Sequence, residues 1–415
     1  MKTNFIPLPS SDQWNIFIQP YHHEAVYSKD VSREALNIHI DSPLYGVGKW
    51  MTQFPIAGEK TYEFSVKAES DCTVNDLFVI ITVLDQNGKM ITRDHARNFS
   101  REDRFVRFYD TLSLPKEATD LKVELWLKGY QGSVTWFDPV LTETKALPKR
   151  LVNIAIAYIP PADDSLRTIE SNKKDIFDAI DASGALDPDI IVLSEAMYKR
   201  GISGFTYGKA AQTDNGEMCT LIGEKAKQYH SYIVYNFIEI DKREYYNTSV
   251  LIDRDGKVVG KYRKTHLTVA ELECGLTPGN DYPVFETDFG RVGMLICWDH
   301  YFPFTAEKLV ENGAEIICVS TAGDAAEQSI ARARDNGTYL AICGWGRSQS
   351  SNLNIGPGRI IAPNGKVIAH TAEKNTPAFA CIDLNEKVRT YWLSLGDAMS
   401  ENYSIYKYEK NIHSS

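Results

Sequence analysis

Residues 291–319 read RVGMLICWDHYFPFTAEKLVENGAEIICV, and this stretch decides the fold of the second half of the chain. Its apolar runs at 292–297 and 315–319 have the length of strands, and the amphipathic segment 303–312 between them has the spacing of a helix. Runs that are apolar throughout are typical of strands buried on both faces, and helices between them indicate a layered α/β protein. The stretch therefore predicts part of an α/β domain.

The same alternation extends from Leu151 towards the end of the chain. Further apolar runs lie at 151–159, 190–193, 232–238, 248–252, 339–343 and 378–382, and further amphipathic stretches lie at 166–182, 218–229 and 325–337. The segment Ala146–Arg150 has the composition of a linker. We therefore expect an α/β domain over residues 148–415.

The first half of the chain has a different pattern of apolar residues. Alternating apolar and polar residues, with a period of two, are seen at 61–67, 77–84, 104–109 and 121–127. Such segments predict strands with one face on a core, and no helical stretch of convincing length interrupts them. Since 415 residues exceed the size of one hydrophobic core, we expect a separate antiparallel β-sandwich, jelly-roll-like, as an accessory domain over residues 1–147.

Composition limits the partners that this protein can have. A formal net charge of −10 disfavours nucleic acid, which usually requires a concentrated basic surface. No window approaches the ~18 apolar residues of a membrane span, and Pro7 and Pro9 interrupt the apolar start, so that no secretory signal is expected. Seven cysteines, an odd number in a long chain, do not form a disulfide framework pattern. These features predict a cytoplasmic protein without a nucleic-acid or membrane partner.

Three reactive residues follow three of the predicted strands. In open α/β sheets, ligands bind beyond the carboxyl ends of the strands. The runs 189–193, 258–263 and 291–296 are followed by Glu195, Lys264 and Cys297. Strand alternation also places Lys264 on the face opposite to its basic neighbours Lys261 and Arg263. An acid, an amine and a thiol are therefore expected at equivalent strand ends.

These three residue types suit nucleophilic catalysis. A free thiol is only a few per cent thiolate at neutral pH, so it needs a base to take its proton. A fixed cation beside a tetrahedral oxyanion can stabilise it by about 3–4 kcal/mol. Glu195 is the expected general base, Cys297 the nucleophile and Lys264 the oxyanion stabiliser. Cleavage of a carbon–nitrogen bond would leave a thioester, which water hydrolyses with Glu195 again as base.

Each residue also has an ordinary explanation, because strand-end acids and lysines are often solvated and cysteines in apolar runs are often buried hydrophobes. Three alternatives stay open. The first is a Cys–His enzyme that uses His266 or His300. The second is a zinc site of Cys297, Asp299 and His300. The third is a catalytically silent or weakly active hydrolase fold that serves as a carbohydrate-binding or ligand-binding protein.

At these residues the chain resembles the nitrilase, or carbon–nitrogen hydrolase, superfamily. The resemblance covers about residues 151–390. It rests on segments in the family's order at 189–195, 246–252, 260–267, 275–279, 285–293, 296–303, 331–339 and 361–367. Two segments depart from the family pattern: Phe304 stands where a glutamate is common, and Gly356–Arg359 replaces a frequent Gly-Glu-Ser sequence.

The resemblance implies a nitrilase-like α-β-β-α sandwich that forms homodimers and needs no metal or organic cofactor. It assigns the triad to Glu195, Lys264 and Cys297. It also implies an additional glutamate that orients the substrate or the lysine, for which Glu271 is favoured over Glu273. The backbone N–H of Trp298 would complete the oxyanion site. The implied substrate is a small molecule with a non-peptide carbon–nitrogen bond, an amide or N-carbamoyl compound more than a nitrile.

The first half loosely resembles carbohydrate-binding-module or galactose-binding-like β-sandwiches. The matching phrases are 55–62, 84–89 and 133–139. Trp126, Trp136 and Phe137 are candidates for a sugar-stacking platform, but their strand positions favour a role in the core.

Overall fold

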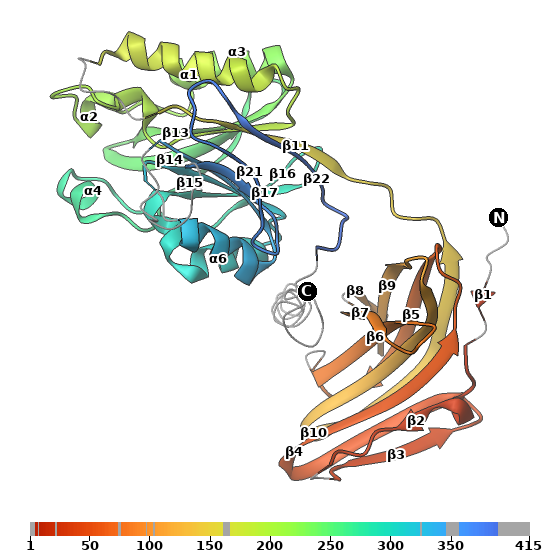
Figure 1. Ribbon diagram of the computed structural model, residues 1–415. Helices are drawn as coiled ribbons and strands as arrows, with labels where there is room; N and C mark the ends of the chain where they lie inside the picture. Colours follow the sequence, from red (N-terminus) through yellow and green to blue (C-terminus); the bar gives the residue numbers. More distant parts are fainter. Residues whose placement is uncertain are drawn as a thin grey trace. The chain divides into compact units, whose positions relative to one another are not determined.

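The computed structural model describes residues 5–6, 8–20, 23–73, 76–96, 98–102, 104–160, 167–323, 326–345 and 357–388. These residues fall into two compact units. One comprises the described residues up to Pro148, and the other comprises Lys149–Val388. Figure 1 draws the first unit in red to yellow and the second in yellow to blue.

The second unit contains two six-stranded sheets. The order of the first is β15-β14-β13-β12-β11-β22, and the order of the second is β16-β17-β18-β19-β20-β21. The strands of the first sheet are β11 (Leu151–Ala157), β12 (Ile190–Leu193), β13 (Tyr232–Asp241), β14 (Glu244–Ile252), β15 (Val258–Arg263) and β22 (Ala378–Asp383). Those of the second are β16 (Val284–Glu286), β17 (Arg291–Ile296), β18 (Ile316–Thr321), β19 (Tyr339–Gly344), β20 (Gly358–Ile361) and β21 (Val367–Thr371).

The two sheets pack face to face, and helices cover their outer faces (Figure 1). Helices α1 (Ile169–Gly184) and α3 (Glu217–Tyr229) lie on the first sheet, whereas α5 (Pro303–Glu311) and α6 (Ala326–Asn336) lie on the second. Strands β12, β18 and β19 are buried along their whole length, as their apolar sequences predict. The predicted α/β alternation is confirmed, and the layers are those of an α-β-β-α, nitrilase-like fold.

Pairing brings the carboxyl ends of distant strands together. Strands β11, β12 and β13 are parallel neighbours, as are β17, β18 and β19. Across the two sheets, Ser320 of β18 donates a hydrogen bond of 2.8 Å to the Leu193 carbonyl at the end of β12. Ile296 pairs with Ser320, so β17 ends at the same place. The segments that carry Glu195 and Cys297 therefore emerge side by side.

The first unit is an antiparallel ten-stranded sheet whose buried apolar residues form a hydrophobic core cluster. Apart from the short 3-10 helix η1 (Ser11–Gln13), its described elements are strands. They are β1 (Phe5–Ile6), β2 (Asn15–Ile16), β3 (Ala25–Asp30), β4 (Ala35–Pro55), β5 (Thr61–Ser70), β6 (Leu77–Asp85), β7 (Met90–His95), β8 (Asn98–Glu102), β9 (Phe105–Ser113) and β10 (Ala118–Thr144).

Two of these strands are far longer than the sequence predicts. Strand β4 has 21 residues and β10 has 27, and they pair with each other along most of their length. The pairing shifts register between Gly129 and Gln131, and Gly129 and Gly132 have φ values of 141° and 146°. Such a bulge lets a strand bend and continue, so glycines that resemble strand ends in the sequence are bends within one strand.

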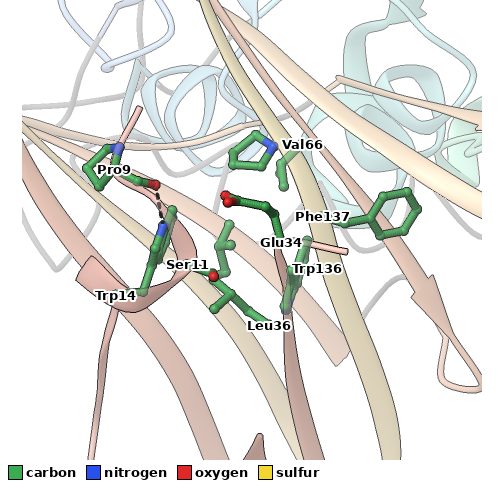
Figure 2. A pocket seen from close by; sticks show the side chains of 10 residues that line it. Pro9, Ser11, Trp14, Glu34, Leu36, Val66, Trp136 and Phe137 are labelled. Atoms are coloured by element: carbon green, nitrogen blue, oxygen red, sulfur yellow. Dashed lines mark hydrogen bonds between the residues drawn. The ribbon is translucent and has the colours of Figure 1, made fainter. Parts of the chain in front are cut away.

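Trp136 of β10 belongs to the core of this unit. Its side chain is 1% exposed and packs near Phe108, with ring centroids 5.6 Å apart. Figure 2 shows it at the wall of a small pocket with Trp14 and Glu34, where the Trp14 indole N–H donates to the Pro9 carbonyl at 3.2 Å. A ring buried to this extent cannot stack on a sugar, so the core interpretation holds for Trp136.

No helix in the part of the chain that the structure describes is both long enough and apolar enough to cross a membrane.

Candidate active site

Glu195 lies two residues after the end of β12, at the meeting point of the two sheets. Its carboxylate Oε2 accepts a hydrogen bond of 2.9 Å from the backbone N–H of Ala322, which follows β18. Its own carbonyl accepts one of 3.0 Å from the indole N–H of Trp345. The next residue, Ala196, has a left-handed backbone (φ 50°) and donates its N–H to Asn236 at 2.8 Å. These contacts fix the acid where the strand ends.

Lys264 follows β15 and is 1% exposed. Its ammonium donates to Glu195 Oε1 at 3.1 Å and to both oxygens of Glu271 at 2.9 Å. Its basic neighbours Lys261 and Arg263 instead bind Glu239. The predicted separation of Lys264 from these two cations is therefore confirmed. Burial would lower the pKa of Lys264, but Glu195, Cys297 and Glu271 raise it well above its usual value, so the ammonium stays charged.

The alternation of side chains between the two faces of β15 does not continue beyond Lys264. Continued alternation would place Thr265 on the face of Lys261 and Arg263, but its hydroxyl lies 3.1 Å from the Tyr262 hydroxyl and donates to Asp299 at 3.1 Å. The reason is that β15 ends at Arg263, and a period of two applies only within a strand.

The two candidate auxiliary glutamates have different environments. Glu271 is 4% exposed, whereas Glu273 is exposed. Both lie in the short helix α4 (Val269–Glu273), where Glu271 Oε2 accepts a capping hydrogen bond of 2.8 Å from the Thr268 N–H. Burial raises the pKa of Glu271, but Lys264 and the hydrogen bonds from Thr268 and Asn247 lower it overall. The structure thus brings Glu271, and not Glu273, to Lys264.

Asn247 connects the two acids and was not singled out from the sequence. Its side-chain amide donates to Glu195 Oε1 and to Glu271 Oε1, both at 2.8 Å. Its backbone carbonyl also accepts from the Lys264 N–H at 2.9 Å. Asn247 is fully buried within β14. An amide just before the apolar end of β14 was the available signal, because buried amides require partners.

Cys297 stands at the junction of β17 and the 3-10 helix η4 (Cys297–Tyr301). Its backbone is left-handed, with φ 45°, a conformation that costs free energy in a non-glycine residue. Burial and the charge of Glu195 raise the pKa of its thiol to about 11, although Lys264, the Thr321 hydroxyl and the Ala322 N–H act in the opposite direction. The resting residue is therefore a neutral thiol that lies within electrostatic reach of both Glu195 and Lys264.

The charges of this cluster do not balance. Two carboxylates, on Glu195 and Glu271, surround the single ammonium of Lys264. The thiol of Cys297 adds no charge while it is protonated. A cluster with one carboxylate in excess has the capacity to accept a proton, which is what a buried thiol requires in order to become a nucleophile.

The histidines near Cys297 make other contacts. His300 Nδ1 hydrogen-bonds to the Cys297 backbone carbonyl, and burial lowers the pKa of His300 to about 4. His266 lies against Asp299 at 3.2 Å and stacks on Phe302, with ring centroids 4.1 Å apart. After burial, the strongest influences on the thiol come from Glu195 and Lys264 and not from a histidine. The geometry does not favour the Cys–His alternative.

The candidate zinc ligands also form other contacts within the fold. Asp299 accepts hydrogen bonds of 2.8 Å from the Tyr262 hydroxyl and from the His266 N–H. Among the described residues, no group of three or more His, Cys, Asp and Glu side chains is arranged to hold a metal ion. All seven cysteines are free.

The sheets, helices and strand-end residues define the class of this unit, an α/β protein of the nitrilase-like type. A sequence model of the carbon-nitrogen hydrolase family matches residues 154–390. The chain therefore belongs to the carbon–nitrogen hydrolase family and is an enzyme that hydrolyses carbon–nitrogen bonds. Residues 1–153 lie outside the match.

Several relatives share part of this chain. A probable nitrilase of Schizosaccharomyces pombe is 30% identical over 52% of this chain and 84% of its own length. A 2-oxoglutaramate amidase of Bacillus subtilis is 28% identical over 48% of this chain and 79% of its own. An omega-amidase of Xenopus laevis is 31% identical over 41% of this chain and 67% of its own length. The crystal structure of Nit3 of Saccharomyces cerevisiae, a nitrilase-superfamily member, is 24% identical over 58% of this chain and 92% of that chain, with a TM-score of 0.48.

Proposed function

We propose that this protein is a cofactor-free thiol amidase in which Glu195 is the general base, Cys297 the nucleophile and Lys264 the oxyanion stabiliser. One observation carries the proposal. The buried Lys264 ammonium donates to Glu195 at 3.1 Å, and both groups interact electrostatically with the Cys297 thiol. Three residues from distant parts of the sequence thus form one acid–amine–thiol cluster.

The first step is attack of the thiol on the substrate carbonyl. Because the pKa of Cys297 is raised to about 11, little thiolate exists at neutral pH, and the proton moves to Glu195 as the sulfur–carbon bond forms. The carbonyl oxygen becomes an oxyanion. Lys264 lies beside the cluster as a permanent cation to stabilise it, and by family analogy the backbone N–H of Trp298 is a second donor.

The intermediate then collapses. The carbon–nitrogen bond breaks, and the leaving nitrogen departs as ammonia or an amine with the proton that Glu195 holds. A thioester remains on Cys297. Water attacks this thioester as Glu195 takes a proton from it, and the acid product leaves while the thiol regains its proton. No oxidant, reductant or metal enters this balance.

Glu271 and Asn247 are positioning residues in this scheme. Glu271 contacts the Lys264 ammonium with both oxygens at 2.9 Å, and Asn247 holds Glu195 and Glu271 at 2.8 Å. These contacts restrict the lysine and the acid to one geometry, and reactions of this kind are sensitive to such orientation.

An amide is the proposed substrate in preference to a nitrile. Two relatives with about 30% identity are named as amidases, the 2-oxoglutaramate amidase and the omega-amidase. N-carbamoyl compounds suit the same steps and form the second part of the proposal.

A substrate library tests both parts. The full-length protein is incubated with amides, N-carbamoyl compounds and nitriles, and ammonia release is measured. With an amide substrate, Glu195→Gln should accumulate a thioester on Cys297 that intact-mass measurement detects, because deacylation lacks its base. Turnover retained in Glu195→Gln at the wild-type rate would overturn the role of this glutamate, and turnover retained in Cys297→Ala would overturn the thiol mechanism.

For the first unit, we propose a jelly-roll-like β-sandwich. The long strand β10 pairs with β6 over residues 118–127 and with β5 over residues 134–144, and both partners contribute to one core cluster. Such a sheet folds over on itself. A glycan array tests whether it binds carbohydrate, with Trp126 and Phe137 as the remaining candidate contacts.

The homodimer and the cytoplasmic location stay predictions. Light scattering coupled to size-exclusion chromatography measures the mass of the particle, which for one chain is 46.8 kDa. A single-chain mass would contradict the dimer.

A further inference from the structure

A groove in the first unit is lined by three cations and one acid. It crosses strands β4, β10, β6 and β7, which pair with one another in that order (Figure 1). Its volume is about 400 Å³, and its charged lining consists of Lys49, Arg93, Lys122 and Glu124. A groove of this volume has room for a small organic molecule. We call it the basic groove.

Strand register places the polar lining of the basic groove on one face of the sheet. Lys122 lies opposite Gln53 of β4 and opposite Thr82 of β6. Thr82 in turn lies opposite Arg93 of β7. Residues directly opposite each other share a face, as do Lys122 and Glu124, which are two positions apart in β10. The alternate residues of β10 belong to the hydrophobic core, so the basic groove lies on the face that points away from the core.

The charges of the basic groove do not balance. Lys49 and Arg93 contact the Glu124 carboxylate at 2.7 and 2.8 Å, and Lys122 approaches the same group at 3.4 Å. Among the described residues, no other carboxylate oxygen lies within 4.0 Å of these three cations. Three cations and one carboxylate leave a surplus of two positive charges, although the chain as a whole has a formal net charge of −10.

Two other grooves of this protein have balanced charges. One groove in the first unit, of about 480 Å³, has a charged lining of Glu63, Lys67, Arg107 and Asp138. There Arg107 contacts Glu63 at 3.1 Å, and Lys67 contacts Asp138 at 3.5 Å. A groove in the second unit, of about 740 Å³, is lined by three lysines and three acids. A surplus of cations is therefore not a general property of the grooves of this chain.

Lys49 is the most buried of the three cations. Its side chain is 10% exposed, and its ammonium lies 4.3 Å from the centroid of the Trp126 ring and 4.6 Å from that of Phe17. Burial lowers the pKa of Lys49, and although Glu124 opposes this shift, the two neighbouring cations add to it. A bound anion would reduce the repulsion among the cations and replace part of the lost hydration.

We propose that the basic groove binds a small organic molecule through a compact dianionic group, a phosphate monoester. A phosphate monoester carries a charge of about −1.5 to −2 at pH 7, which matches the surplus of two positive charges. Its oxygens can accept charge-assisted hydrogen bonds from the partly exposed side chains of Arg93 and Lys122, which have more N–H groups than Glu124 can satisfy. Leu84 and Met90 complete the lining and offer an apolar contact to the organic part. This inference does not depend on the proposed amidase function.

Calorimetric titration of the full-length protein at pH 7.5 and low ionic strength tests the inference, because salt screens such contacts. Phenyl phosphate is the probe. Phenyl sulfate and phenol have the same organic part with one negative charge and with none, and inorganic phosphate has the anionic group alone. Phenyl phosphate should bind to one site per chain, about 10-fold more tightly than phenyl sulfate, and phenol should not bind.

Substitutions locate the site. Lys122→Gln and Arg93→Gln each remove one surplus charge and should weaken the binding of phenyl phosphate by about 10- to 100-fold. Lys122→Arg keeps the charge and should retain most of the affinity. Arg107→Gln is the matched control, because it removes a cation from the balanced groove of the same unit, and it should leave the affinity within about 2-fold of the wild type. Thermal unfolding without ligand shows whether each variant is folded.

Four results would overturn the assignment. The first is the absence of phenyl phosphate binding at millimolar concentrations. Equal affinities for phenyl sulfate and phenyl phosphate would contradict the recognition of a dianion. Inorganic phosphate that binds as tightly as phenyl phosphate would indicate a site for the free ion and not for an organic molecule. Equal weakening in Arg107→Gln and Lys122→Gln would show attraction to the overall charge and not to the basic groove.

Discussion

The two units of this protein each contain a buried lysine paired with a glutamate, and the surroundings of the two pairs have opposite charge. In the first unit, Lys49 contacts Glu124 at 2.7 Å. Arg93 and Lys122 approach the same carboxylate at 2.8 and 3.4 Å, so that three cations share one acid. In the second unit, two carboxylates share the single ammonium of Lys264.

The difference appears in the pKa values of the two lysines, which shift in opposite directions. Burial lowers the pKa of Lys49, and Glu124 restores it only in part, because Lys122 and Arg93 repel the ammonium. The acids around Lys264 instead raise its pKa. A pair with excess cations is a stable structural link, whereas a pair with an excess acid and an adjacent thiol can move a proton. A lysine–glutamate contact alone therefore does not indicate a catalytic site.

The largest expected effect comes from removing the thiol. Cys297→Ala should lower amide turnover by about 10⁴-fold or more, since no other group in the scheme can form the thioester. Lys49→Met, at the structural pair, should leave turnover unchanged. Ammonia release measures both. Substantial activity in Cys297→Ala would remove the distinction between the two pairs.

The next largest effect concerns stability, because removing each of the two lysines should lower the unfolding free energy by a different amount. Lys264→Met leaves two buried carboxylates without a cation and should cost about 3–5 kcal/mol of unfolding free energy. Lys49→Met leaves Glu124 with Arg93 and Lys122, so we expect a loss of about 1–2 kcal/mol. Urea unfolding, monitored with signals from both units, measures the loss of unfolding free energy in each variant. Equal losses would show that the surrounding charge does not matter.

A smaller effect is expected at the auxiliary glutamates. Glu271→Gln removes a charge that contacts Lys264 and should lower kcat by about 10- to 100-fold. Glu273→Gln is its matched control in the same helix, and because Glu273 is exposed its kcat should stay within about 2-fold of the wild type. Steady-state kinetics distinguishes them, and the reverse ranking would reassign the auxiliary role.

The smallest effect concerns acid stability of the first unit. Burial raises the pKa of Glu124, but Lys49 and Arg93 lower it overall. A carboxyl with a lowered folded pKa stabilises the fold above its unfolded pKa of about 4.3, and this stabilisation is lost as pH falls through the folded value. Glu124→Gln should therefore be less stable than wild type at neutral pH, and the difference should shrink below about pH 4. Thermal unfolding at several pH values checks this, and a difference that grows in acid would contradict it.

Much of the second unit was predictable because its information is local. The apolar runs 190–193 and 315–319 correspond to strands β12 and β18 in the structure, and the amphipathic stretch 303–312 corresponds to helix α5. The separation of Lys264 from Arg263 followed from strand alternation. The two long strands of the first unit were not predictable in this way, because Gly129 and Gly132 interrupt the pattern while pairing with β4 continues across them.

The site was predictable in its reactive residues but not in their supports. Glu195, Lys264 and Cys297 each follow an apolar run, which marks them in the sequence. The choice of Glu271 over Glu273 depends on which side of one short helical turn faces Lys264. The role of Asn247 depends on pairing between β14 and β15. Neither the choice of Glu271 nor the role of Asn247 can be deduced from the neighbouring sequence.

The sequence by itself determined the layered α/β architecture, the family and the strand ends at which an acid, an amine and a thiol occur, because periodicity and chain direction are local properties. Only the tertiary structure decided the charge balance around Lys264 and the buried amide that joins its two acids. These depend on contacts between segments far apart in the chain, where burial and distance set the strength of each electrostatic interaction.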